Sequence, residues 1–97
     1  MADPIYKFWK SKPKEAWYQL SKEEQNSHQA QVQEALRKVG GKTILMCTPA
    51  WSSEWLLCGV EEFPDIEAVY KFTEILYQLD HFRYNESSSM LGIKYPP

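Results

Sequence analysis

The strongest constraint on this chain is a repeated change in the spacing of its hydrophobic residues. Alternating patterns typical of strands occupy four segments, and patterns with a repeat of three to four residues, typical of helices, occupy two. In chain order the strands are predicted at 5–12, 43–51, 54–63 and 90–95, and the helices at 21–39 and 65–84. The resulting order is strand, helix, strand, strand, helix, strand.

The predicted helix ends carry specific signals. Ser21 followed by Glu24 forms a capping box, and Gly40-Gly41 ends the same helix. Asp65, directly after Pro64, is a good N-cap for the second helix. These signals support the helical assignments independently of the hydrophobic repeat.

The second and third strands of the chain, 43–51 and 54–63, are predicted to form a hairpin. If Ser52-Ser53 is a two-residue turn, the antiparallel register places Cys47 opposite Cys58. Pro49 cannot donate a hydrogen bond to a neighbouring strand, so the first of these strands is expected at a sheet edge.

Right-handed connections turn this order into a split βαβ arrangement. We therefore predict the α+β class and a ferredoxin-like fold: a four-stranded antiparallel sheet with two helices on one face. At 97 residues, the whole chain, 1–97, is expected to be a single domain.

The predicted strands are apolar on both faces, although two helices can cover only one. In the segment 43–51, for example, Ile44 and Met46 alternate with Leu45 and Cys47. A large uncovered apolar surface marks an interface, and a second copy of the chain packed sheet to sheet would cover it. The sequence therefore predicts a homodimer.

Composition narrows the function classes. Eleven Lys and Arg against 13 Asp and Glu argue against a nucleic-acid partner, and no segment is long and apolar enough to predict a membrane partner. No zinc-type Cys/His spacing or glycine-rich phosphate loop is present, so no metal and no cofactor are predicted. The N-terminal residues do not form a secretory signal, and we expect a cytoplasmic protein with reduced cysteines.

Several motifs resemble the dimeric α+β barrel superfamily. They are AWYQLSKEEQ (residues 16–25), FPDIEAVYKF (63–72) and LDHFRY (79–84). The first motif and the later Arg-Tyr resemble darcynin-like proteins, and Asp-His-Phe resembles antibiotic-biosynthesis-monooxygenase-type domains. The resemblance implies a homodimer with a ligand cleft between sheet and helices, in a superfamily that includes cofactor-free oxygenases and cyclases. Darcynin-like chains usually carry an aromatic or apolar residue where His28 stands, so chemistry at that position is not carried over.

Two histidines are candidates for the predicted cleft. His81 is the candidate general base, assisted by Tyr84 as the second catalytic candidate or by Asp80. Its structural interpretation is a favourable interaction with a helix C-terminus. His28 lies on the apolar side of the first helix, where it either reaches the ligand or packs in the core.

Aromatic residues make up 14% of the chain and suit a small aromatic ligand. Trp17, Trp55 and Phe72 are the predicted substrate-binding wall, although aromatic residues also serve as core and interface residues. Lys7, between apolar neighbours in a predicted central strand, either requires a buried partner or extends to the rim.

Two functions follow from these patterns. The first is binding, with or without cofactor-free oxygenase-like or cyclase-like chemistry, of a small aromatic or polyketide-like molecule. The second is a non-catalytic dimeric structural or regulatory domain. RNA binding shares the element order, but 54–63 lacks the basic-glycine-aromatic pattern of RNA-recognition strands.

Overall fold

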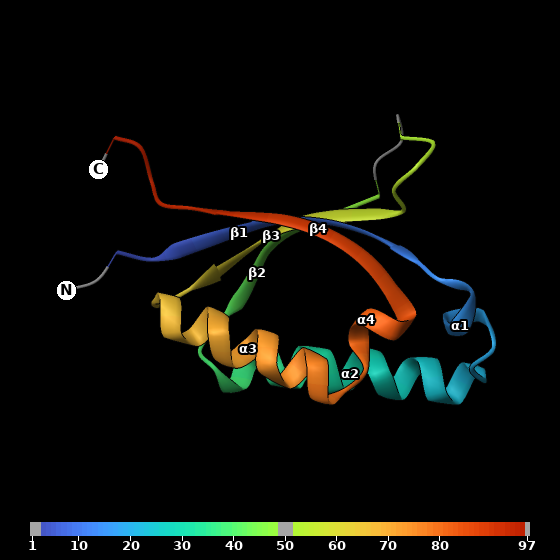
Figure 1. Ribbon diagram of the computed structural model, residues 1–97. Helices are drawn as coiled ribbons and strands as arrows, with labels where there is room; N and C mark the ends of the chain where they lie inside the picture. The colour runs from blue at the N-terminus through green and yellow to red at the C-terminus, as the bar shows by residue number, and fades with distance from the viewer. Residues whose placement is uncertain (1–2, 49–51, 97) are drawn as a thin grey trace.

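The computed structural model describes residues 3–48 and 52–96 and contains one layer of strands above a layer of helices (Figure 1). The sheet consists of β1 (Ile5–Pro13), β2 (Lys42–Cys47), β3 (Leu57–Phe63) and β4 (Asn85–Gly92). Its strand order is β2-β3-β1-β4, and every neighbouring pair is antiparallel. The predicted α+β, ferredoxin-like fold is confirmed.

The two long helices lie on one face of this sheet, as predicted (Figure 1). Helix α2 (Lys22–Lys38) begins with the predicted capping box, because Ser21 accepts from the Glu24 amide and the Glu24 carboxylate accepts from the Ser21 amide. Helix α3 (Ile66–Gln78) begins where Asp65 Oδ1 accepts from the Ala68 amide at 2.8 Å. Among the described residues, no helix is long and apolar enough to span a membrane.

The prediction of one helix over 65–84 is wrong at its C-terminal end. Helix α3 ends at Gln78, and Asp80 adopts a left-handed conformation (φ 58°) before a separate short helix, α4 (His81–Tyr84). Aspartate tolerates this conformation better than most residues. The chain therefore changes direction before His81, and the helical repeat cannot be extended through this point.

The predicted strand over 90–95 is also displaced. Strand β4 starts at Asn85, includes the three serines 87–89 and ends at Gly92. It is an edge strand paired with β1, and the backbone pairing outweighs the weak hydrophobic pattern of its first half. A short helix, α1 (Glu15–Tyr18), follows β1 and was not predicted.

The hairpin register agrees with the sequence. Cys47 pairs with Cys58, and β2 is an edge strand as expected from Pro49. Both strands are shorter than predicted, and a register shift between Thr43 and Leu45 interrupts their pairing. Pro49 itself lies outside the described residues, as does Trp51.

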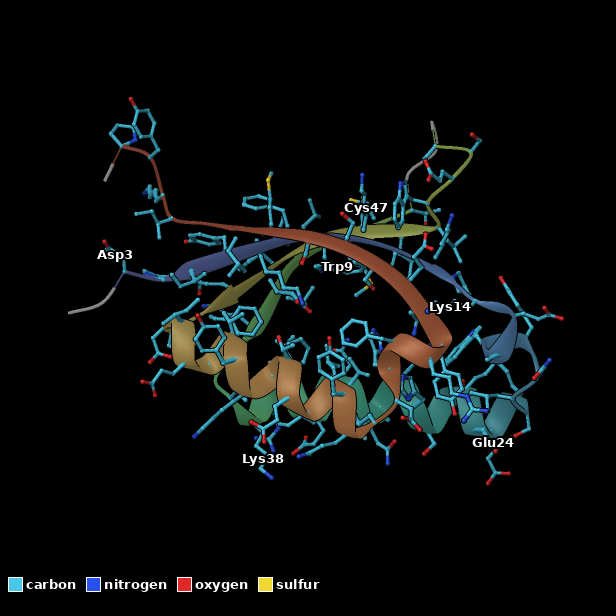
Figure 2. All side chains as sticks on the ribbon, viewed as in Figure 1. Asp3, Trp9, Lys14, Glu24, Lys38 and Cys47 are labelled. Carbon is cyan, nitrogen blue, oxygen red and sulfur yellow. The ribbon has the colours of Figure 1, made fainter. Side chains whose placement is uncertain are left out.

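Alternation along β1 separates the two faces of the sheet. Ile5 packs against the core, and Trp9 lies on the helix side, whereas Cys47 of β2 lies on the opposite side (Figure 2). The buried hydrophobic core between sheet and helices consists of Ala35, Leu36, Phe63, Ala68, Val69, Phe72 and Leu76.

No described helix covers the other face of the sheet, which we call the outer face. Phe8 of β1, Leu45 of β2 and Met90 of β4 lie on it, with 42%, 56% and 68% of their surfaces exposed. Val60 pairs with both Phe8 and Leu45 and continues the apolar surface across β3. The sequence-based expectation of an uncovered apolar sheet face is met in the single chain.

We predict that Gly59→Ala destabilises the protein by roughly 1–3 kcal/mol, because overpacking forces neighbouring groups to move. A β-carbon on Gly59 would lie 2.6 Å from the Leu45 carbonyl oxygen and 2.9 Å from the Trp9 ring. The control is Gly92→Ala, whose β-carbon meets Phe8 only at 3.8 Å. Urea unfolding measures both, and equal losses of stability would contradict this packing argument.

Candidate functional site

The two histidines of the chain lie in direct contact. His28, in α2, is 7% exposed, and His81 is the first residue of α4. His28 Nε2 lies 3.1 Å from His81 Nδ1, and the two rings are nearly parallel, with an interplanar angle of 9°. Residues separated by 53 positions in the sequence thus form one hydrogen-bonded imidazole pair.

Aromatic rings surround this pair. The ring of Trp17 lies 5.7 Å from that of His28, and the ring of Tyr84 lies 5.3 Å from it, both in edge-on arrangements. Phe82 contacts the other side, with its ring 5.3 Å from that of His81. Of the residues predicted for the site, the fold therefore brings together His28, His81, Tyr84 and Trp17.

The short helices α1 and α4 hold this cluster. The Lys14 ammonium donates to the Phe82 carbonyl at 2.7 Å, and the Lys14 amide donates to the Tyr84 carbonyl at 2.8 Å. Asn85 Nδ2 donates to the His81 carbonyl at 3.3 Å. The two Lys14 bonds attach α4 to the segment preceding α1, and Trp17 and Tyr84 contact the same histidine.

Both imidazoles are held in the neutral form. Burial, together with the nearby His28 and Lys7, lowers the pKa of His81 to about 4. Burial also lowers the pKa of His28. In a neutral pair one nitrogen donates and the other accepts, which matches the single contact between the rings.

A second pair of titratable groups lies on the helix side of the sheet. Lys7 of β1 is directly opposite Glu61 of β3, and Glu61 is only 8% exposed. Burial lowers the pKa of Lys7 and raises that of Glu61, and each charge opposes the shift of the other. Lys7 Nζ also lies 5.3 Å from the centre of the Phe72 ring. Of the two interpretations of Lys7, a buried partner or extension to the rim, the placement of Glu61 opposite it favours the first, and the sequence did not indicate Glu61.

Trp9 adds an unused hydrogen-bond donor on this side. Its Nε1 is buried and has no hydrogen-bond partner among the described residues. It lies two residues from Lys7 on the same face of β1, and the sequence analysis did not single it out for the site. A buried donor without an acceptor is uncommon in proteins and indicates a position where an acceptor can bind.

The remaining predicted wall residues lie elsewhere. Trp55 is packed beside lysines of the outer face, with Lys10 Nζ 4.8 Å and Lys12 Nζ 5.4 Å from its ring centre. Phe72 belongs to the buried core, where its ring lies 5.6 Å from that of Phe63. The structure thus does not bring Trp17, Trp55 and Phe72 together into one wall.

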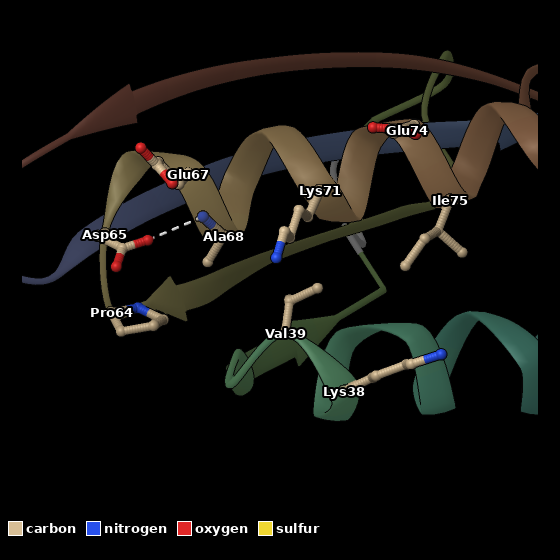
Figure 3. Close-up of a pocket in the computed structure, with 9 residues that line it drawn as sticks. All are labelled: Lys38, Val39, Pro64, Asp65, Glu67, Ala68, Lys71, Glu74 and Ile75. Carbon is tan, nitrogen blue, oxygen red and sulfur yellow. Dashed lines mark hydrogen bonds between the residues drawn. The ribbon is translucent and has the colours of Figure 1, made fainter.

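Two surface hollows lie outside the histidine cluster. One, of about 510 Å³, lies between the end of α2 and the first turns of α3 (Figure 3). Its charged residues, Lys38, Asp65, Glu67, Lys71 and Glu74, have mixed signs, and its lining contains no histidine, cysteine or hydroxyl group. The other lies on the outer face around Phe8, Leu45, Cys47 and Met90.

Within residues 3–48 and 52–96, no group of three or more His, Cys, Asp or Glu is placed to hold a metal ion.

No protein-family description matches this chain, and no curated protein is similar to it in sequence. Solved structures are similar in fold. A variant of chlorite dismutase from Candidatus Nitrospira defluvii superimposes with a TM-score of 0.77 over 99% of this chain and 42% of that chain, at 17% identity. The same enzyme in complex with imidazole gives 0.76 over 97% and 41%, at 13% identity.

A protein of unknown function from Rhodopseudomonas palustris gives a TM-score of 0.72 over 100% of this chain and 86% of that chain, at 12% identity. This chain spans about two fifths of the chlorite dismutase chains. These similarities show that the chain has a ferredoxin-like fold. The resemblance to darcynin-like and monooxygenase-type domains stays a prediction.

We predict that His81 makes the protein less stable as pH falls from about 6.5 to about 4. The unfolded chain protonates His81 near its ordinary pKa of 6.5, whereas the folded chain does so only near 4. The contribution of neutral His81 to the free energy of unfolding is complete above pH 6.5 and is lost as pH falls through 4. Reduced for solvent screening, it amounts to about 2 kcal/mol. Urea unfolding of His81→Gln should show a flatter pH dependence than wild type, and Tyr70→Phe, on the exposed side of α3, should not. An unchanged slope in His81→Gln would contradict the buried neutral imidazole.

Proposed function

We propose that this protein binds a small aromatic molecule on the helix side of its sheet, next to the imidazole pair. The observation that carries the proposal is the cluster of His28, His81, Trp17 and Tyr84, in which aromatic rings surround two neutral histidines. Aromatic walls with a few polar groups are typical of small-molecule sites.

The polar groups indicate the kind of aromatic molecule. Trp9 Nε1 offers a donor without an acceptor, and the lowered pKa of His81 is caused in part by the charge of Lys7. Both groups favour a ligand that bears an oxygen acceptor or a partial negative charge. A phenol, a quinone or a polyketide-like enol meets these requirements.

The imidazole pair also supplies acid–base chemistry without a cofactor. When His81 Nδ1 donates to His28 Nε2, the lone pair of His81 Nε2 is free to accept a proton from a ligand hydroxyl or an activated carbon. Tyr84, within the same cluster, would then donate a hydrogen bond to the developing oxyanion. In this version the protein is a small oxygenase-like or cyclase-like enzyme.

One observation favours the second function, a non-catalytic domain. His28 is almost fully buried, and its Nε2 already has a protein partner in His81. A histidine satisfied in this way is typical of a structural residue that packs two helices together. The two functions differ in whether the cluster accepts a ligand at all.

A thermal-shift screen with phenols, quinones and small polyketide-like enols tests the ligand proposal. At least one compound should raise the melting temperature of wild type and bind His81→Gln at least about tenfold more weakly, because a lost hydrogen bond of 1.4 kcal/mol corresponds to that factor. Tyr84→Phe should also bind more weakly, and the control Tyr70→Phe should bind like wild type. Absence of binding across the screen, or equal binding by His81→Gln, would favour the non-catalytic domain.

We also propose that the protein is a homodimer through its outer face. The structure is thin, with principal dimensions of 44 × 31 × 16 Å, and one of its broad sides is the uncovered sheet. That side is large enough for the roughly 800 Å² per subunit that a stable interface requires. The resemblance to the dimeric α+β barrel superfamily implies the same sheet-to-sheet arrangement.

The distribution of charge on this face suits a second copy. Phe8, Val60, Leu45 and Met90 form an apolar centre. Ion pairs lie along its margins, with Lys42 Nζ 3.1 Å from Glu62 and Lys12 Nζ 3.3 Å from Glu86. An apolar centre with a polar rim is typical of homodimer interfaces. Because these charges are already paired within the chain, a self-complementary surface need not leave them without partners.

Sedimentation of the purified chain tests the dimer. Wild type at micromolar concentration should sediment at twice the 11.4 kDa chain mass, and Phe8→Glu should sediment as a monomer because it places a charge in the apolar centre. Ile66→Glu, at an exposed apolar position of α3, should remain dimeric. A monomeric wild type would overturn the proposal without affecting the ligand site.

A further inference from the structure

Two cysteines face each other on the outer face of the sheet. Cys47 is the last residue of β2, and Cys58, the second residue of β3, is its direct partner in the antiparallel register. Both are free thiols in the structure, with Cys47 exposed and Cys58 partly buried. Directly paired residues of antiparallel strands project their side chains to the same face.

This placement matches the geometry of a disulfide. Paired residues in antiparallel sheets have Cα atoms about 4.5 or 5.5 Å apart, depending on the hydrogen-bonding position. Both spacings lie within the roughly 4.4–6.8 Å range of disulfides. Small adjustments are available, because Cys47 ends an edge strand whose pairing is already irregular between Thr43 and Leu45.

We propose that Cys47 and Cys58 form a reversible redox site that is oxidised to an intrachain disulfide by low-molecular-weight disulfides of the glutathione class. Cys47, which is exposed in the single chain and ends β2, is the thiol that a reagent reaches first, and Cys58 is the resolving thiol beside it. Lys10, directly opposite Cys58 on β1, places a positive charge near the pair and favours an anionic reagent.

The reaction balances without a further reactant. The Cys47 thiolate attacks one sulfur of the reagent, whose S–S bond breaks to release one thiol, and a mixed disulfide remains on Cys47. The Cys58 thiolate then attacks the Cys47 sulfur and releases the second thiol. The protein loses two electrons and two protons, and the reagent disulfide gains both as two thiols.

The site is independent of the imidazole pair and of the proposed ligand. Cys47 lies on the outer face (Figure 2), and Cys58 is its direct strand partner. His28 belongs to α2 and His81 to α4, which lie on the other side of the sheet (Figure 1). The bridge forms within one chain and needs no second copy. Failure of the redox site would therefore leave the proposed ligand site unaffected. The proposed dimer, which uses the same outer face, is tested separately by sedimentation.

Equilibration of the full chain with mixtures of reduced and oxidised glutathione tests the proposal. After alkylation, intact-mass measurement should show a wild-type species without alkyl or glutathione adducts, and a non-reducing gel should show it as a single chain. Cys47→Ser and Cys58→Ser each retain one thiol and should accumulate the glutathione mixed disulfide instead. Wild type that keeps both thiols, accumulates mixed disulfide or forms interchain dimers would overturn the proposal.

A second measurement tests whether the sheet positions the two sulfurs. The same equilibration in concentrated urea removes the strand pairing but keeps the sequence separation of the cysteines. The ratio of bridged to reduced protein should be at least about tenfold higher in the folded chain, since pairing raises the effective concentration of one thiol near the other. An equal ratio in urea would mean that the short sequence separation of the cysteines is sufficient for disulfide formation, and it would contradict positioning by the sheet.

Discussion

Alternation along the central strand β1 is the constraint on which the rest of the structure depends. Because β1 pairs with both β3 and β4, its register decides the face of every residue opposite it. Ile5, Lys7 and Trp9 face the helices, whereas Phe8 and Lys10 face outward. A shift by one residue would place Lys7 outside and Phe8 against the helices. It would disrupt the core, the placement of Lys7 opposite Glu61 and the apolar outer face at once.

The imidazole pair depends on a second, more local constraint. Asp80 interrupts the helical repeat with a left-handed residue, and α4 then starts in a new direction with His81. In an uninterrupted helix, His81 would continue the direction of α3 and would not be free to meet His28 of α2. The backbone conformation of Asp80 therefore decides whether the two histidines stay apart or form a hydrogen-bonded pair.

The two faces of the sheet separate two kinds of chemistry. The helix side holds the imidazole pair, a buried donor on Trp9 and the titratable side chains of Lys7 and Glu61, which are opposite each other in the sheet. The outer face holds the apolar centre and the paired thiols of Cys47 and Cys58. Each face can be changed by substitution without altering the other, since successive residues of a strand project to opposite sides. This separation keeps the proposed ligand site on one face and places the proposed dimer interface and redox site together on the other, within 97 residues.

The sequence by itself determined the order of the four strands and two long helices, the helix starts at Ser21 and Asp65 and the pairing of Cys47 with Cys58, because caps, turns and hydrophobic repeats act over a few residues. It also indicated His28, His81, Tyr84 and Trp17 as separate candidates. Only the tertiary structure decided that these four meet, that Trp55 and Phe72 lie apart from them and that Glu61 is opposite Lys7. Those contacts depend on strand register, on the break at Asp80 and on the docking of α4, which are set by packing between residues far apart in the chain and leave no local pattern.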